Sequence, residues 1–215
     1  MITLSQIQTP PHITAVLDTF LKVFFGKFAS SLDFWVAGGA VRDLIAGKRI
    51  HDLDVFFPGE QSRLIFERRL KEICRDRMRV NHDSATAVHI ETLPGSPFGH
   101  LQIDSIKRYF GSPADTIVQF DYTVNCAAVQ YNSITGQMLF THHPDFFVDL
   151  AAHRLMVNKL PFPVDSLRRA FKYVERGFKI CPGELQKVVD AIRSAPMAVV
   201  LPNGVTAPNG FYMVD

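Results

Sequence analysis

The stretch that organises the chain is Phe34–Phe57, FWVAGGAVRDLIAGKRIHDLDVFF. Its first residues, Phe34–Ala37, are aromatic or apolar and stop at a double glycine, which predicts a buried strand ending in a tight turn. Ala40–Ala46 carries apolar residues at helical spacing and is followed by Gly47, so a short helix with a glycine cap is expected. Asp52–Phe57 alternates with a period of two, as a second strand does.

The second strand carries two carboxylates on one face. Period-two geometry places Asp52 and Asp54 on one side and Leu53 and Val55 on the other. Mg²⁺ binds in proteins through one or two carboxylates together with substrate phosphates. An Asp-x-Asp pair alone is more often a solvated strand end, but the adjacent glycine turn favours a metal site, and we predict Asp52 and Asp54 as catalytic metal ligands.

The glycine turn itself suits a phosphate chain. Gly38 and Gly39 let backbone N–H groups approach a polyphosphate closely, and the helix that follows turns its positive end toward that charge. Arg42, in the first helical turn, is predicted to reach a phosphate. The alternative is that the two glycines form an ordinary turn.

The order GGAVRD, an eight-residue gap and DLD resembles the head of the class II nucleotidyltransferases, the family of bacterial poly(A) polymerases and tRNA CCA-adding enzymes. The resemblance implies an α/β fold, a polymerase beta-like palm with a mixed sheet flanked by helices and followed by a short helical neck. It further implies that an RNA 3′-hydroxyl attacks the α-phosphate of an NTP, with ATP or CTP favoured. Two Mg²⁺ ions are expected, and Mn²⁺ is an alternative metal.

A third carboxylate is expected on a neighbouring strand. Thr86–Glu91 and Leu101–Ile106 are predicted as strands joined by a Pro/Gly-containing hairpin loop, and Asp104 lies in the second of them. The family commonly places an acidic residue in this strand, and Asp104 is the candidate third metal ligand. The alternative is an edge-strand aspartate paired with Lys107 or Arg108.

A second motif lies in QFDYTVNCAAV, residues 119–129. It resembles the family's RRDFTxNA motif, whose aspartate and asparagine lie near the ribose, which makes Asp121 and Asn125 candidate nucleotide-binding residues. Four residues apart, they are expected to share one helical face. Gln119 and Phe120 replace the two arginines of the motif. A helix-capping role is the alternative for Asp121.

A third motif lies in VDSLRRAFKYVERGF, residues 164–178. It resembles the family's EDxxR neck motif, in which an aspartate and an arginine contact the edge of the incoming base. Asp165 and Arg168 keep this i, i+3 spacing on one face of a predicted helix, whereas Val164 replaces the glutamate. An N-cap role is the alternative for Asp165.

The remaining elements complete the expected architecture. Ile13–Phe28 is predicted as an amphipathic helix with its phenylalanines in the core, and Glu60–Arg79 as a charged surface helix. Met138–Thr141 is predicted as the last strand and Glu184–Arg193 as a further helix. We expect a nucleotidyltransferase head over residues 1–150, followed by a helical neck and an irregular cap over residues 151–215.

Composition limits the class of protein. The 215 residues are 47% hydrophobic and 20% charged, with a net charge of +2, so a globally basic nucleic-acid coat is not indicated. The three cysteines are widely spaced and include no CxxC pair, which favours a reduced cytoplasmic setting over a disulfide or zinc framework. No export signal, membrane span or membrane partner is expected.

The function expected from these features is transfer of a nucleotide from an NTP to an acceptor hydroxyl, an RNA 3′ end in the first hypothesis. The resemblance covers roughly residues 30–180, without the helical regions that hold a tRNA or a poly(A) primer in the family. Two alternatives therefore stay open. The acceptor is a protein or a small molecule, or the chain is a non-catalytic nucleotide- or RNA-binding remnant of such an enzyme.

Overall fold

The computed structural model describes residues 5–8, 21, 23–28, 32–50, 52–132, 135, 137–195, 198–200 and 206–208, with side chains from residue 21 to residue 195. The chain divides into two compact units. The first comprises Met1–Ile117 and Asn125–Pro144, and the second comprises Val118–Val124 and Asp145–Asp215. The expected domain boundary at residue 150 stays a prediction.

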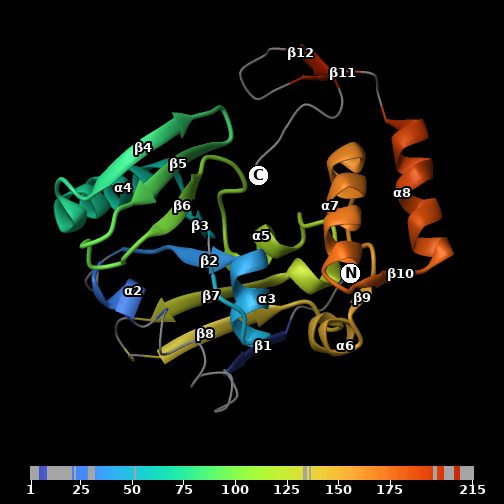
Figure 1. Cartoon of the computed structure of the whole chain (residues 1–215), viewed down its shortest axis with the longest axis horizontal. Coiled ribbons are helices and arrows are strands. Elements are labelled where there is room, and N and C mark those ends of the chain that lie inside the picture. Colours follow the sequence, from blue (N-terminus) through green and yellow to red (C-terminus); the bar gives the residue numbers. More distant parts are fainter. Residues whose placement is uncertain are drawn as a thin grey trace. The chain divides into compact units, whose positions relative to one another are not determined.

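The first unit is built on a mixed sheet of eight strands in the order β1-β8-β7-β2-β3-β6-β5-β4 (Figure 1). Neighbouring strands are antiparallel except β3 and β6, which are parallel. The α/β class and the mixed sheet predicted from the sequence are therefore confirmed. The strands are β1 Ser5–Gln8, β2 Trp35–Ala37, β3 Asp52–Phe56, β4 Met78–Asp83, β5 Ala87–Thr92, β6 Leu101–Ile106, β7 Ala127–Asn132 and β8 Gln137–His142.

The organising stretch folds as expected, into strand, glycine turn, helix and strand. β2 leads into Gly38, whose φ of 81° lies in the left-handed region that glycine tolerates. Helix α3, Gly39–Ile45, follows, and β3 then pairs antiparallel with β2. The tight glycine turn thus brings the start of α3 beside the strand that carries Asp52 and Asp54.

The two faces of β3 and its neighbours differ in polarity. Leu53, Val55 and Ile103 are fully buried, and helix α4, Glu60–Cys74, packs on this face through Phe66 and Leu70. The Ser105 hydroxyl donates to a Glu67 carboxylate oxygen at 2.7 Å, which ties β6 to α4. The opposite face carries the carboxylates, because successive side chains of a strand alternate.

Phenylalanines from separate elements fill the core beside α4. The ring of Phe28 stacks on Phe66 with 4.7 Å between centroids, and Phe34 lies 5.1 Å from Phe66. Phe24 and Phe25, in helix α2, Val23–Gly26, are buried with them. These phenylalanines are core residues, as predicted, whereas residues 13–20 of the expected helix lie outside the described residues.

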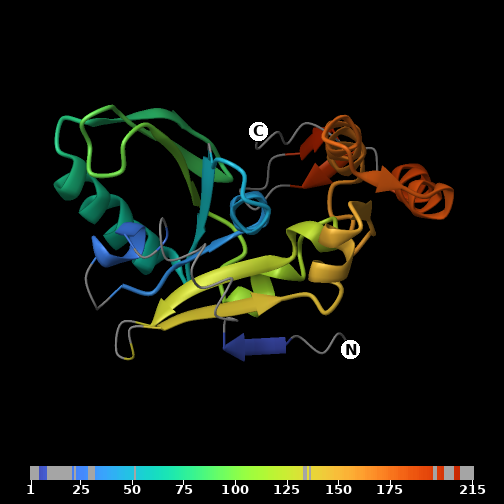
Figure 2. The same cartoon turned by 60° about the horizontal axis from the view of Figure 1, so that its bottom comes forward.

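The expected surface helix over residues 60–79 is too long. α4 ends at Cys74, and Arg75 turns the chain with a φ of 52°. Met78–Asp83 then forms β4, which pairs antiparallel with β5 at the edge of the sheet (Figure 2). The error has a physical cause: an edge strand is largely exposed, so its mixed charged sequence resembles the polar face of a helix.

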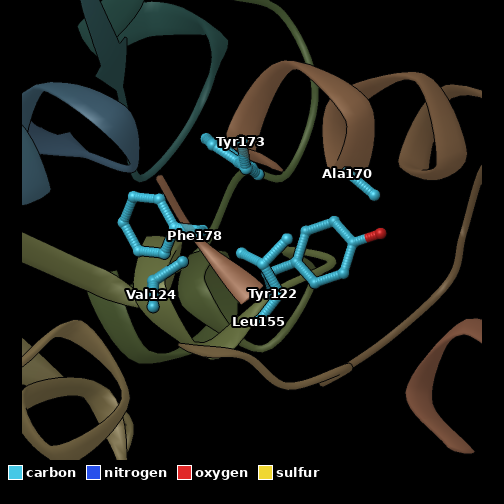
Figure 3. Close-up of a cluster of buried hydrophobic side chains, with 6 residues drawn as sticks. All are labelled: Tyr122, Val124, Leu155, Ala170, Tyr173 and Phe178. Atoms are coloured by element: carbon cyan, nitrogen blue, oxygen red, sulfur yellow. The ribbon is translucent and has the colours of Figure 1, made fainter. Parts of the chain in front are cut away.

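The second unit packs around the α7 helix. Figure 3 shows its core, in which the rings of Tyr122, Tyr173 and Phe178 meet. The other members of the cluster are Val124, Leu155 and Ala170. Helix α7 packs against α8. The elements of the unit are α6 Phe146–Ala151, β9 Arg154–Leu155, α7 Pro163–Glu175, β10 Lys179–Ile180, α8 Pro182–Ser194, β11 Ala198–Val200 and β12 Thr206–Pro208.

Two short helices complete the chain. α5, Pro113–Ile117, lies in the first unit, where the Trp35 indole donates to the Thr116 hydroxyl at 3.1 Å. The 3-10 helix η2, Thr123–Asn125, spans the point at which the chain passes from the second unit to the first. None of the described helices is long and apolar enough to cross a membrane.

Candidate active site

Asp52 and Asp54 lie on the polar face of β3, at the N-terminal end of the strand. β3 pairs in parallel with β6. Asp52 is exposed and Asp54 is half-buried, whereas Leu53 and Val55 between and after them are fully buried. The shared face predicted from the alternation is therefore present. In the parallel ladder Asp54 stands opposite Asp104, so the third predicted carboxylate faces the same side of the sheet.

Asp104 is buried, with 7% of its surface exposed. Burial raises the pKa of its carboxyl and the charge of Asp52 adds to this, whereas His89 opposes it. The His89 Nδ1 lies 2.8 Å from Asp104 Oδ1. The alternative pairing of Asp104 with Lys107 is wrong, because the Lys107 ammonium binds Asp83 and the Ser84 carbonyl oxygen.

The three carboxylates fit a hard divalent cation by their chemistry. They offer oxygen donors, which Mg²⁺ and Mn²⁺ prefer, and a cation would offset the repulsion between Asp52 and Asp104. Among the described residues, no group of three or more His, Cys, Asp or Glu side chains already surrounds a metal position. Mg²⁺ is usually bound through one or two carboxylates and completes its shell with water and substrate phosphates.

Arg42 lies under the glycine turn instead of extending from it. The residue is 3% exposed. Its guanidinium donates from Nη1 to Asn125 Oδ1 at 2.7 Å and from Nε to Asp43 Oδ1 at 2.8 Å. A Cβ at Gly39 would stand 3.5 Å from Arg42 Nη2, so the turn and the guanidinium are in close contact. The Gly38 N–H donates to the Ala127 carbonyl oxygen at 3.0 Å. The structure thus joins three predicted site residues, Gly39, Arg42 and Asn125, in one small network.

Asp121 belongs to the second unit, where α7 holds it. Arg169 Nε donates to Asp121 Oδ2 at 2.5 Å, and the Tyr122 N–H donates to Oδ1 at 3.0 Å. Burial alone would lower the pKa of the Arg169 guanidinium, but the charge and hydrogen bond of Asp121 raise it. Sequence reasoning missed Arg169, because no local pattern links residues 48 apart.

The expectation that Asp121 and Asn125 share a helical face is wrong. Tyr122 forms a β-bridge with Val157, and only the three residues of η2 are helical. The physical reason is the change of unit: Tyr122 is anchored in the second unit through its hydroxyl, which donates to the Ser166 carbonyl oxygen at 2.8 Å. Asp121 contacts the Tyr122 N–H and Arg169, and the 3-10 helix η2 begins two residues later, at Thr123.

Asp165 and Arg168 lie one turn apart on α7, as the motif predicts. Asp165 is buried, Arg168 is exposed, and the Nη1 to Oδ1 distance is 3.6 Å. The N-cap of α7 is Phe162, so the alternative of Asp165 as the N-cap is wrong. Both groups lie on the same side of α7, where the carboxylate acceptor is below the surface and the guanidinium donor fork is exposed.

Solved structures share this fold. The Thermotoga maritima CCA-adding enzyme complexed with tRNA_CCA matches with a TM-score of 0.60 at 22% identity, over 90% of this chain and 46% of that one. A CCA-adding enzyme complexed with CTP matches with a TM-score of 0.61 at 22% identity, over 90% and 47% of the two chains. The fold is therefore that of the CCA-adding class of nucleotidyltransferases.

The family is more specific than the class. Residues 12–153 match the model of the Gabija anti-defense 2 family, Gad2, and the chain belongs to this family. A curated relative named Gabija anti-defense 2, from Bacillus phage SPbetaL7, is 28% identical over 157 residues, which are 72% of this chain and 36% of that protein. The chain thus spans about a third of this relative and just under half of the two enzymes.

Proposed function

We propose that this chain is a metal-dependent nucleotidyltransferase that moves a nucleotide from an NTP to an acceptor hydroxyl and releases pyrophosphate, and that it acts against a Gabija defence. The observation that carries the proposal is the arrangement of three carboxylates beside a glycine turn. Asp52 and Asp54 share a face of β3, and Asp104 stands opposite Asp54 on β6. The family name supports the anti-defence role.

Asp52, Asp54 and Asp104 would hold Mg²⁺, two ions in the complete site, or Mn²⁺. The bound metal would lower the pKa of the attacking hydroxyl and neutralise charge on the departing pyrophosphate. The carboxylates themselves orient the site, because they lie on neighbouring strands of one rigid sheet. Asp52, the exposed member, is accessible to a phosphate-bound ion.

The other predicted residues divide between shaping and recognition. Gly38 and Gly39 would admit the triphosphate to the backbone, and Arg42, held by Asn125, would keep that turn in shape. On the second unit, Asp165 and Arg168 are the proposed base-recognition pair and Asp121 the proposed ribose-recognition residue. ATP or CTP is the proposed donor, and the cytoplasm is the proposed site of action.

The acceptor we propose is an RNA 3′ end, since a structural neighbour was solved with tRNA_CCA. The second candidate is a protein component of the defence system, which the family name favours. A non-catalytic nucleotide-binding protein would bind NTP and metal without transfer. These three possibilities differ in what becomes labelled.

The test supplies each NTP labelled at the α-phosphate, with Mg²⁺ or Mn²⁺, to total RNA and total protein from cells that carry a Gabija system. The wild type should label RNA, and D52N and D54N should lower the rate by about 100-fold or more, because each removes metal binding worth several kcal/mol. D76N is the matched control, since Asp76 is an exposed carboxylate beyond α4. Equal labelling by the wild type and both strand variants would contradict the proposal.

A further inference from the structure

A row of polar residues crosses the sheet from the candidate metal site to its edge. Asp54 on β3 stands opposite Asp104 on β6, Asp104 opposite His89 on β5, and His89 opposite His82 on β4. Residues directly opposite each other on adjacent strands project from the same face. His89 therefore lies on the carboxylate face, immediately behind the third candidate ligand.

The distances between neighbouring side chains along this row differ. His89 Nδ1 is 2.8 Å from Asp104 Oδ1, and the two side chains are 23% and 10% exposed. The His82 ring lies nearly parallel to the His89 ring, with 5.8 Å between centroids and an angle of 16°. His82 is exposed on the edge strand. The short contact is thus the one between the histidine and the carboxylate.

We propose that His89 is a positioning residue, whose Nδ1–H donates to Asp104 Oδ1 and fixes the rotation of that carboxylate, leaving its other oxygen for the cation that Asp52 and Asp54 bind. This inference rests on the proposed function. Groups that donate a hydrogen bond to a metal-binding carboxylate hold it in place in many sites, and their removal weakens metal affinity by about 10–100-fold.

Strand pairing brings His89 and Asp104 together. The two residues stand opposite each other in the antiparallel β5–β6 ladder, and the ring nitrogen nearest the backbone, Nδ1, contacts Asp104 Oδ1. Lys107, the nearest basic residue along the chain, is bound to Asp83. His89 is therefore the group that the sheet presents to Asp104 in the described part of the chain.

The test measures Mn²⁺ affinity directly, by the electron paramagnetic resonance of free Mn²⁺ in titrations of the full chain. H89F should weaken binding by about 10–100-fold. H89N should restore affinity to within about threefold of the wild type, because the asparagine amide places an N–H where Nδ1 stands, whereas H89Q should not. H82F, which changes the outer histidine, is the matched control and should bind like the wild type.

The outcomes separate this inference from the proposed function. One outcome is that the wild type binds Mn²⁺, that D52N and D54N no longer bind it, and that H89F binds it as tightly as the wild type. This outcome would overturn the role of His89 but leave the carboxylate site supported. If the wild type binds no Mn²⁺, the proposed metal site fails and the inference with it. Should H89F fail to fold, the comparison of H89N with H89Q decides, and equal affinity of these two variants would overturn the inference.

Discussion

Arg42 is a buried cation held by two side chains, and its role begins with that burial. Its Nη1 donates to Asn125 Oδ1 at 2.7 Å, and the residue is 3% exposed. A buried charge needs such partners, because burial of an unpaired one is strongly unfavourable. The arginine of the sequence motif therefore serves first to connect α3 to the start of β7.

Replacing Arg42 should destabilise the protein as well as the site. R42A should lower the free energy of unfolding by about 2 kcal/mol, since hydrogen bonds to charged groups contribute about 1.5–3 kcal/mol. R42K should be destabilised too, because a lysine ammonium cannot replace both guanidinium hydrogen bonds, the one to Asn125 and the one to Asp43. Urea unfolding checks this, with R68A on exposed α4 surface as a control expected within about 0.5 kcal/mol of wild type. An R42A variant as stable as R68A would contradict this reading.

The cysteines should differ in reactivity according to burial. Cys181 is exposed, whereas Cys74 and Cys126 are buried. Desolvation raises the pKa of the Cys74 thiol to about 11, so at pH 8 only about one molecule in a thousand carries its thiolate. Iodoacetamide labelling followed by mass spectrometry should modify Cys181 within minutes and Cys74 only after unfolding. Equal labelling of both in the native protein would show that α4 is not packed as described.

Single residues show which features a sequence can predict. The alternation through Asp52 and Asp54 predicts their shared face, because the strand period is local. The pairing of His89 with Asp104 across two strands could also be predicted from the sequence, because both residues lie equally far from the Ser96–Pro97 peptide at the centre of the hairpin loop. The pairing of Arg169 with Asp121 could not be predicted from the sequence, because the packing of α7 determines it and no short-range spacing encodes it.

At the scale of elements, the side chain of one carboxylate links β4 to β5 in addition to their backbone ladder. Glu91 on β5 accepts hydrogen bonds from Arg79 at 2.7 Å and Asn81 at 3.2 Å, both on β4, and pairs with His100 at 2.6 Å. These contacts, with His100 contributing most, lower the pKa of Glu91 from 4.5 to about 2. Glu91 thereby links the edge strand to the strand that holds His89.

This pKa predicts how stability changes in acid. A carboxyl whose pKa is depressed by folding contributes stability that is complete above its unfolded pKa, near 4.5, and is lost as the pH falls through its folded pKa, about 2. Urea unfolding should therefore show wild type more stable than E91Q at pH 6, with the difference shrinking between pH 4.5 and pH 2.5. E72Q, which removes an exposed carboxylate of α4, should track wild type throughout. A difference that stayed constant with pH would contradict the assignment.

Element boundaries were predictable where apolar periodicity was strong. α7 begins and ends within a few residues of expectation, at Pro163 and Glu175, because its buried face repeats regularly. The boundary between α4 and β4 could not be predicted, because an exposed edge strand carries no strong apolar periodicity. The chain changes element at Arg75, whose φ of 52° is one that glycine adopts more readily, so the residue type does not signal the turn.

At the scale of the whole molecule, Val118–Val124 is a segment of the second unit placed in the middle of the first unit's sequence. Tyr122 is fully buried there, and its hydroxyl binds the Ser166 carbonyl. The segment is also joined to residues 156–158 by backbone hydrogen bonds from Thr123 to Met156 and from Asn158 to Asp121. Its stability should therefore follow that of α7.

Hydrogen exchange tests this assignment. Y122F should lower the free energy of unfolding by about 1 kcal/mol, because one hydrogen bond is lost. Hydrogen exchange should become faster in residues 118–124 and in α7 together, while β7 and β8 stay protected. Y109F is the control, because Tyr109 lies in the first unit. Faster exchange in β7 and β8 than in α7 after Y122F would contradict the division into these units.

Nucleotidyl transfer is tested by an experiment that compares labels at two positions of one NTP. Purified wild type is incubated with Mg²⁺, RNA and Gabija proteins, and with NTP labelled at either the α- or the γ-phosphate. If the protein transfers a nucleotide, α-label becomes bound to an acceptor while γ-label leaves in pyrophosphate, and D52N and D54N abolish both. Transfer of γ-label to the acceptor, or transfer of α-label that survives in both variants, would contradict it.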